Sequence, residues 1–178
     1  IIGNPNVGKS TLMNALIGQK LSIITNKAQT TRHRILGILN EKDYQIVFSD
    51  TPGVIDPAYK LQESMMNFVY SAFQDADVLI YMIEVGERGL KDQRLFERLK
   101  KTEIPVLILL NKIDLAEQDL VAQEMERWNA ELPNAELLPI SALNNFNLDV
   151  VKKKLIDMLP VSAPYYDKDA ITDKSERF

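Results

Sequence analysis

The sequence predicts an α/β fold, in which a mostly parallel sheet is covered by helices on both faces. Three observations predict it. The length of 178 residues, 46% hydrophobic and 26% charged, is typical of a single globular domain. Short apolar runs suited to strands alternate with segments whose apolar residues recur at helical spacing. Two of these runs are separated by only a short turn, which predicts one antiparallel edge pair in an otherwise parallel sheet.

The first elements follow from local residue types. The chain opens on a strand cut short, with only two isoleucines before Gly3. A helix is predicted over 9–17, because leucines recur on one face and Gly18 can end it. The polar stretch 19–33 has no apolar periodicity and is expected to be a long loop.

The remaining elements continue the alternation. Residues 34–40 and 44–50 read as strands joined by the turn 41–43, which is the antiparallel pair. Helical spacing then appears in three stripes: Leu61, Met65, Phe68, Val69 and Ala72; Leu90, Leu95 and Leu99; Val121, Met125, Trp128 and Leu132. Further strands are expected over 78–85, 104–110 and 136–140, and a last helix over about 147–159.

The composition excludes several classes of function. A net charge of -4 and a pI near 5.1 argue against a free-standing nucleic-acid binder, which needs a surplus of Lys and Arg on one face. The absence of cysteine excludes disulfides, thiolate zinc sites and thiol catalysis, and it fits a cytosolic protein. The longest apolar runs fall far short of the roughly 20 residues of a membrane helix.

Residues 3–10, GNPNVGKS, fit the phosphate-loop pattern G-x-x-x-x-G-K-[ST] and stand between a strand and a helix, where the chemistry requires them. Gly3 and Gly8 let backbone amides wrap phosphate oxygens, and the helix N-terminus adds partial positive charge. Lys9 is expected to reach the β- and γ-phosphates, and the Ser10 hydroxyl to bind Mg²⁺. A Gly-rich turn followed by a chance Lys-Ser is the alternative.

The stretch SDTPGV, 49–54, is the second motif of the predicted phosphate site. Asp50 ends a strand beside the phosphate loop, at the carboxyl edge where open α/β sheets bind ligands. Its expected role is to hold a Mg²⁺ water, while Gly53 offers a backbone amide to the γ-phosphate. Val54 comes next, and its side chain can neither accept a proton nor orient a water.

The motif NKID, 111–114, indicates the base. The Asp114 carboxylate can accept hydrogen bonds from guanine N1–H and the N2 amino group, whereas adenine offers neither donor. Asn111 is expected to tie this loop to the phosphate loop, with the Lys112 stem along the plane of the base. In SAL, 141–143, the Ala142 amide can donate to guanine O6.

These motifs together predict a guanine-nucleotide site. The residues expected to line it are Gly3, Asn4, Pro5, Asn6, Val7, Gly8, Lys9, Ser10, Thr11, Asp50, Thr51, Pro52, Gly53, Asn111, Lys112, Asp114, Ser141, Ala142 and Leu143.

With these parts in order, the chain resembles the Era family of bacterial GTPases, in the TrmE/Era group of P-loop GTPases. The motifs GNPNVGKSTLMNAL, KAQTTRHRI, DTPG, NKID and ITDKSERF carry the resemblance, which covers essentially the whole chain. QTTRHRI and ITDKSERF are its specific features. The resemblance implies a P-loop GTPase fold with a six-stranded sheet and one antiparallel edge strand.

The resemblance also implies site roles. Thr31 is assigned as the switch residue that meets Mg²⁺ and the γ-phosphate, with Thr30 as the alternative. Mg²⁺ ligation would then involve Ser10, Thr31 and Asp50, and catalysis Lys9, Thr31, Gly53 and Asn6. In this group the asparagine at the position of Asn6 helps to bind K⁺, and an apolar residue at Val54 implies slow hydrolysis by the isolated domain.

The resemblance implies a division into a GTPase domain over 1–160 and a linker over 161–178. Members of the family carry a C-terminal KH domain that binds small-subunit ribosomal RNA and assists 30S assembly; it would begin where the chain stops. Peripheral membrane association is reported for the family, and a monomer is expected.

Three functions of different classes remain open from the sequence. They are a GTPase acting as a timer, a nucleotide-gated binding module in which hydrolysis is incidental, and a P-loop kinase or ATPase. NKID and SAL argue against the last.

Overall fold

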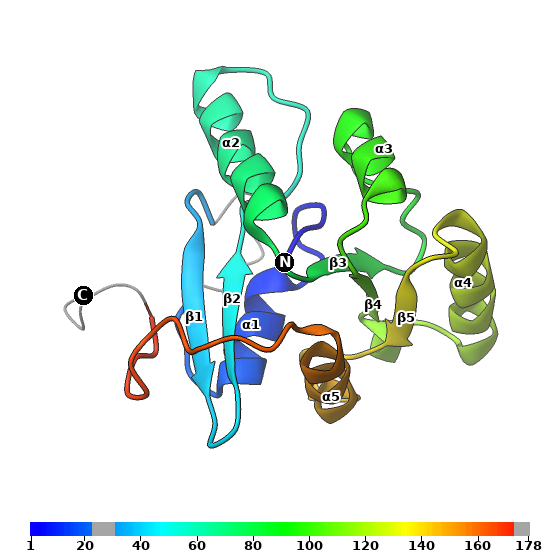
Figure 1. Cartoon of the computed structure of the whole chain (residues 1–178). Coiled ribbons are helices and arrows are strands. Elements are labelled where there is room, and N and C mark those ends of the chain that lie inside the picture. The colour runs from blue at the N-terminus through cyan, green and yellow to red at the C-terminus, as the bar shows by residue number, and fades with distance from the viewer. Residues whose placement is uncertain (23–30, 173–178) are drawn as a thin grey trace.

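The computed structural model describes residues 1–22 and 31–172, and it shows strands flanked by helices (Figure 1). Strands β3 (Leu79–Glu84), β4 (Val106–Asn111) and β5 (Glu136–Pro139) form a parallel sheet in that order. Strands β1 (Ile35–Asn40) and β2 (Gln45–Asp50) form an antiparallel pair. The predicted combination of parallel strands and one antiparallel pair is confirmed.

The predicted single six-stranded sheet differs from what the structure shows, because the described residues contain five strands in two sheets. The N-terminal segment lies between the sheets. The Ile2 amide donates to Ile80 O and its carbonyl accepts from Met82 N, both at 2.8 Å, while the Ile1 nitrogen donates to Ser49 O at 2.7 Å. This contact amounts to one parallel bridge, Ile2 with Tyr81, and one bridge is too short to form a strand.

Beyond the bridge, β2 and β3 separate. A cavity of about 320 Å³ opens between them, lined among others by Phe48 from β2 and Leu79 from β3. Within residues 1–22 and 31–172, the short N-terminal segment links the two sheets by backbone hydrogen bonds, and side chains of both sheets also share one core cluster.

The helices cover both faces of the parallel sheet, as the sequence predicts (Figure 1). Their bounds are α1 Lys9–Ile17, α2 Lys60–Asp75, α3 Gln93–Lys101, α4 Gln118–Glu131 and α5 Leu148–Met158, with a short 3-10 helix, η1, at Ile113–Leu115. Helices α2, α3 and α4 pack on one face, and α1 and α5 on the other. Within the described ranges, no helix is both long and apolar enough to cross a membrane.

The apolar runs of the central strands follow from this double cover. In β3, Tyr81 and Ile83 belong to the core cluster beneath α2, α3 and α4, whereas Ile80 and Met82 belong to the cluster beneath α1 and α5. Successive side chains of a strand point to opposite faces, so a strand covered on both faces is apolar throughout.

The segment after α5 lies against the β1–β2 hairpin (Figure 1). The side-chain oxygen of Gln45 accepts from the amides of Tyr165 and Tyr166, at 2.9 and 3.0 Å. Farther along, the Ile38 amide donates to Ile171 O at 2.7 Å. Backbone groups on the hairpin edge thereby find partners within the chain.

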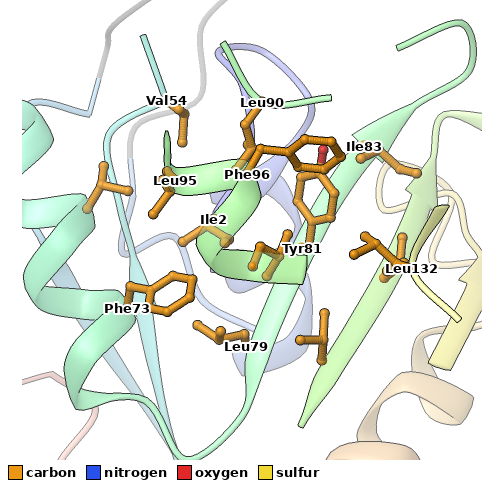
Figure 2. Packing of buried hydrophobic residues seen from close by; sticks show 14 of the residues in the cluster. Ile2, Val54, Phe73, Leu79, Tyr81, Ile83, Leu90, Leu95, Phe96 and Leu132 are labelled. Carbon is orange, nitrogen blue, oxygen red and sulfur yellow. The ribbon is translucent and has the colours of Figure 1, made fainter. Parts of the chain in front are cut away.

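Three aromatic rings form the centre of the larger core cluster. Tyr81 and Phe96 each meet Trp128 edge to face, with ring centroids 5.6 and 6.3 Å apart. Figure 2 shows Tyr81 and Phe96 packed together beside Ile83. The Tyr81 hydroxyl is buried, has no hydrogen-bond partner among the described residues, and has its pKa raised by burial.

Replacing this tyrosine by phenylalanine tests the packing. Because Tyr81→Phe removes an unsatisfied buried hydroxyl and keeps the ring, we expect the free energy of unfolding to stay unchanged or rise by up to about 1 kcal/mol. Tyr70→Phe is the matched control, since the Tyr70 hydroxyl donates to the buried Asp92 carboxylate and its loss is expected to cost about 1–2 kcal/mol. Urea unfolding measures both; an equal loss in the two variants would contradict the prediction.

Candidate nucleotide-binding site

The phosphate-loop motif forms the turn that leads into α1. Gly8 precedes the helix in the left-handed region, at φ 103°, and no side chain caps the first turn. The first backbone amides of a helix have no intrahelical partner and carry partial positive charge, so they form an anion site. The structure therefore places the predicted loop, with Thr11 following in the first turn, where phosphate groups can be bound.

Lys9 is buried beneath this loop. Its ammonium donates to the carbonyls of Gly3 and Asn4, at 3.1 and 2.8 Å. Burial lowers the pKa of Lys9 from 10.5 to about 8, and the carboxylates of Asp50 and Glu87 oppose that shift. A desolvated cation with little compensating charge is well suited to receive phosphate oxygens.

The Asn4 side chain makes its contacts outside the phosphate loop. Its carboxamide nitrogen donates to Gly89 O at 2.8 Å and to the Glu87 carboxylate, and its oxygen accepts from Lys91 N at 3.0 Å. Burial raises the pKa of Glu87. The Asn4 side chain thus anchors the phosphate loop to the β3–α3 loop, and only its backbone is left to contribute to a phosphate site.

Oxygen atoms of three predicted metal ligands lie together at the start of α1. The Ser10 hydroxyl donates to Asp50 Oδ2 at 2.6 Å. The Thr31 hydroxyl oxygen lies 3.3 Å from the Ser10 hydroxyl oxygen. Asp50 is fully buried, and its Oδ1 has no partner among the described residues. Hydroxyl and carboxylate oxygens are the ligands that Mg²⁺ prefers, so the set fits that ion.

Thr31 lies beside Ser10, as expected of the switch threonine, whereas the alternative, Thr30, lies outside the described residues; which of them meets a metal stays a prediction. No group of three or more His, Cys, Asp or Glu side chains suited to a metal occurs in 1–22 and 31–172. The residues predicted to bind Mg²⁺ are two hydroxyl residues and one carboxylate, so they do not form such a group of three His, Cys, Asp or Glu side chains.

The DTPG segment packs directly on the phosphate loop. A Cβ at Gly53 would lie 2.7 Å from the Pro5 Cα, so only glycine permits this approach. The Thr51 hydroxyl donates to Ile1 O at 2.8 Å, and Pro52 is buried. These two residues shape the turn, while Gly53 brings its backbone to the loop.

Val54 is not at the surface of the site. Its side chain is fully buried in the core cluster that also contains Leu90 and Leu95 (Figure 2). Its amide donates to Gly3 O at 2.9 Å. Because the Val54 side chain is apolar and buried, it offers no group that could orient a water, as expected from the sequence.

One side chain joins the loops of the predicted base site to the phosphate loop. The Asn111 carboxamide donates to Val7 O at 2.8 Å and accepts from the Ala142 amide at 2.9 Å. The predicted tie is therefore present. In this arrangement the Ala142 amide already has an acceptor, so a guanine O6 would share that donor with Asn111.

The other residues of the predicted base site sit around this tie. Asp114 is exposed on η1, and Lys112 adopts the left-handed conformation, with its ammonium paired to Glu84. Ser141 is buried and its hydroxyl accepts from Asn144 N at 3.3 Å, whereas Leu143 is 77% exposed.

Asn6, the predicted K⁺ ligand, lies in the left-handed region at φ 67° with an exposed side chain. Within the part of the chain that the structure describes, its carboxamide forms no hydrogen bond, so it is available to a ligand.

Three residues at the site were missed from the sequence: Asn14, Ser22 and Glu87. Asn14 is a buried amide among the leucines of α1, and a polar residue within an apolar stripe was the available signal. Ser22 lies in the polar loop and Glu87 in the β3–α3 loop, where neither periodicity nor a motif marked them.

A phosphate loop at a helix N-terminus, a hydroxyl–carboxylate cluster beside it and an NKID loop at the same sheet edge define the class of P-loop nucleotide-binding proteins. A family model described as "50S ribosome-binding GTPase" matches residues 1–112. This is more than half of the chain, which therefore belongs to this family of GTPases.

The relatives are consistent with that family. GTPase Era from Clostridium beijerinckii and from Clostridium botulinum (strain Hall) are each 42% identical to the chain over its whole length. A crystal structure of Era with MgGDPNP and nucleotides 1506–1542 of 16S ribosomal RNA matches 98% of the chain with a TM-score of 0.91 and 38% identity. An Aquifex aeolicus Era variant bound to GDP and AlF4⁻ also matches 98%, with a TM-score of 0.87 and 38% identity. The chain spans 60% of the length of each of these relatives.

The buried ammonium gives a pH prediction. Below about pH 8, Lys9 is charged in both the folded and the unfolded state, so the full desolvation cost opposes folding. Between pH 8 and 10.5, the folded state loses the Lys9 proton before the unfolded state does, so this cost declines as the pH rises. Without added nucleotide, Lys9→Met should therefore raise the free energy of unfolding at pH 7 by about 3 kcal/mol, with a smaller gain at pH 10.

Urea unfolding at both pH values measures this difference. Lys101→Met, at an exposed position of α3, is the control and is expected to change little. A destabilised Lys9→Met variant at pH 7 would show that the desolvation cost is already compensated.

Proposed function

We propose that this chain binds GTP and GDP with Mg²⁺ and slowly hydrolyses GTP to GDP and phosphate. The observation that carries the proposal is the Asn111 tie. It fixes the phosphate loop, the NKID loop and the SAL loop as one unit, with Asp114 on the exposed side of that unit. The Era structures with MgGDPNP and with GDP and AlF4⁻ support the same ligands.

Each group of residues in the site would have its own role in binding the nucleotide. The amides at the start of α1 and the backbone at Gly53 would face phosphate oxygens, and Lys9 would exchange its two carbonyl acceptors for the β- and γ-phosphates. Ser10, Asp50 and Thr31 would hold Mg²⁺, which supplies positive charge to neutralise the phosphate oxygens. Asp114 would select guanine, because its carboxylate accepts where guanine donates.

The residue directly after DTPG is the reason to expect slow turnover. Ras-like enzymes place a glutamine after D-x-x-G to orient water. Here the corresponding side chain is Val54, which is apolar and in the core. Charge stabilisation must then come from another source, and we propose K⁺ bound with the help of the exposed Asn6 side chain.

For the whole protein, we propose a molecular switch in 30S subunit assembly that reaches small-subunit ribosomal RNA through a KH domain following 161–178. The support is the similarity to Era, whose crystal structure includes a 16S ribosomal RNA segment. A nucleotide-gated binding module with incidental hydrolysis is the second candidate, and the buried Val54 favours it. Single-turnover phosphate release separates the two.

Base selection is tested by exchanging one acceptor for a donor. Asp114→Asn removes the acceptor for guanine N1–H and offers an amide that the C2 carbonyl of xanthine can accept from. We therefore expect GTP affinity to fall by at least about a hundredfold and xanthosine triphosphate to bind instead. Asp119→Asn, an exposed aspartate in the first turn of α4, is the matched control. Equal GTP affinity in the two variants, or preference for ATP in the parent, would remove the guanine assignment.

The cation is tested by salt exchange. Replacing NaCl with KCl at fixed ionic strength should raise single-turnover GTP hydrolysis, because a monovalent cation near the phosphates stabilises the charge that develops as the bond breaks. Asn6→Ala should abolish the difference while largely preserving GTP binding. Asn129→Ala, on the exposed side of α4, should retain it. Identical rates of the parent in both salts would leave a partner as the source of activation.

A further inference from the structure

The start of the loop after α1 is fixed to that helix by one side chain. The Asn14 oxygen accepts from the amides of Leu21 and Ser22, both at 2.9 Å, and its nitrogen donates to Ser22 O at 2.8 Å. Asn14 is only 7% exposed, so these bonds have little competition from water. The backbone of Ser22 is therefore held in place from α1, independently of its own side chain.

The Ser22 side chain reaches the metal-site carboxylate. Its hydroxyl donates to Asp50 Oδ2 at 2.9 Å, and both residues are buried. Ser10 donates to the same oxygen at 2.6 Å. Two hydroxyls thus occupy Oδ2, while Oδ1 is left without a partner among the described residues.

This arrangement sets the orientation of the carboxylate. Rotation of the Asp50 group would break both bonds to Oδ2, one from Ser10 on α1 and one from Ser22, which α1 also holds. Because Asp50 is fully buried, no water could replace them at low cost. The free Oδ1 is then kept available for a further donor, and a metal-bound water is such a donor.

We propose that Ser22, held by Asn14, is a positioning residue that fixes the Asp50 carboxylate for the Mg²⁺ site. The proposal rests on the function proposed above. Groups that hydrogen-bond a metal-site carboxylate typically change metal affinity 10–100-fold when removed. Ser22→Ala should therefore weaken Mg²⁺ binding to the nucleotide complex by roughly tenfold.

The experiment follows dissociation of a fluorescent GDP analogue as free Mg²⁺ is varied. Four proteins are compared: the parent, Ser22→Ala, Asp50→Asn and the double variant. Ser22→Ala should move the Mg²⁺ midpoint about tenfold upward, and it should add little in the Asp50→Asn background because it acts through that carboxylate. Ser64→Ala, at an exposed position of α2, is the control, and thermal unfolding verifies that each variant is folded.

The outcomes separate this inference from the function on which it rests. If Asp50→Asn leaves the Mg²⁺ dependence unchanged, the assignment of the metal site itself fails. If Asp50→Asn shifts it but a folded Ser22→Ala does not, the positioning role is overturned. A Ser22→Ala effect of equal size with and without the Asp50 carboxylate would also overturn it.

Discussion

The site depends on the two hydrogen bonds of the buried Asn111 carboxamide. One reaches the phosphate loop at Val7 and the other reaches Ala142, so three loops far apart in sequence are held together by a single side chain. The contact constrains a fourth residue, because a Cβ at Gly8 would fall 2.3 Å from Asn111 Nδ2. Gly8 is therefore required for packing as well as for phosphate access.

Helix α1 organises the phosphate and metal end in a similar way. Lys9 and Ser10 open the helix, and Asn14, one turn later, fixes the start of the following loop. Lys9 and Ser10 thus belong to one rigid helix, and Asp50 is hydrogen-bonded to that helix through Ser10. Buried Lys9 and Asp50 lower folding stability unless they are compensated, which is a common feature of functional sites.

Much of the fold and the site was predictable because it follows from local pattern. The helix over 9–17 ends at Gly18 as expected, and the hairpin at 41–43 joins the antiparallel pair. The tie between Asn111 and the phosphate loop followed from motif and sheet topology alone. The number of strands could not be predicted from local pattern, because the pairing of the first residues depends on neighbours that are distant in sequence.

The sequence by itself determined the class of fold and the residue types of the site. Apolar periodicity indicates which side chains must be buried, and the spacing in GNPNVGKS and NKID predicts which loops face a ligand. Only the tertiary structure decided the roles that depend on long-range contacts. It directs the Asn4 carboxamide to the β3–α3 loop, places Val54 in the core and brings Ser22 to Asp50. A hydrogen bond or a packed side chain needs both partners in place, and residues separated by tens of positions meet only when the chain has folded.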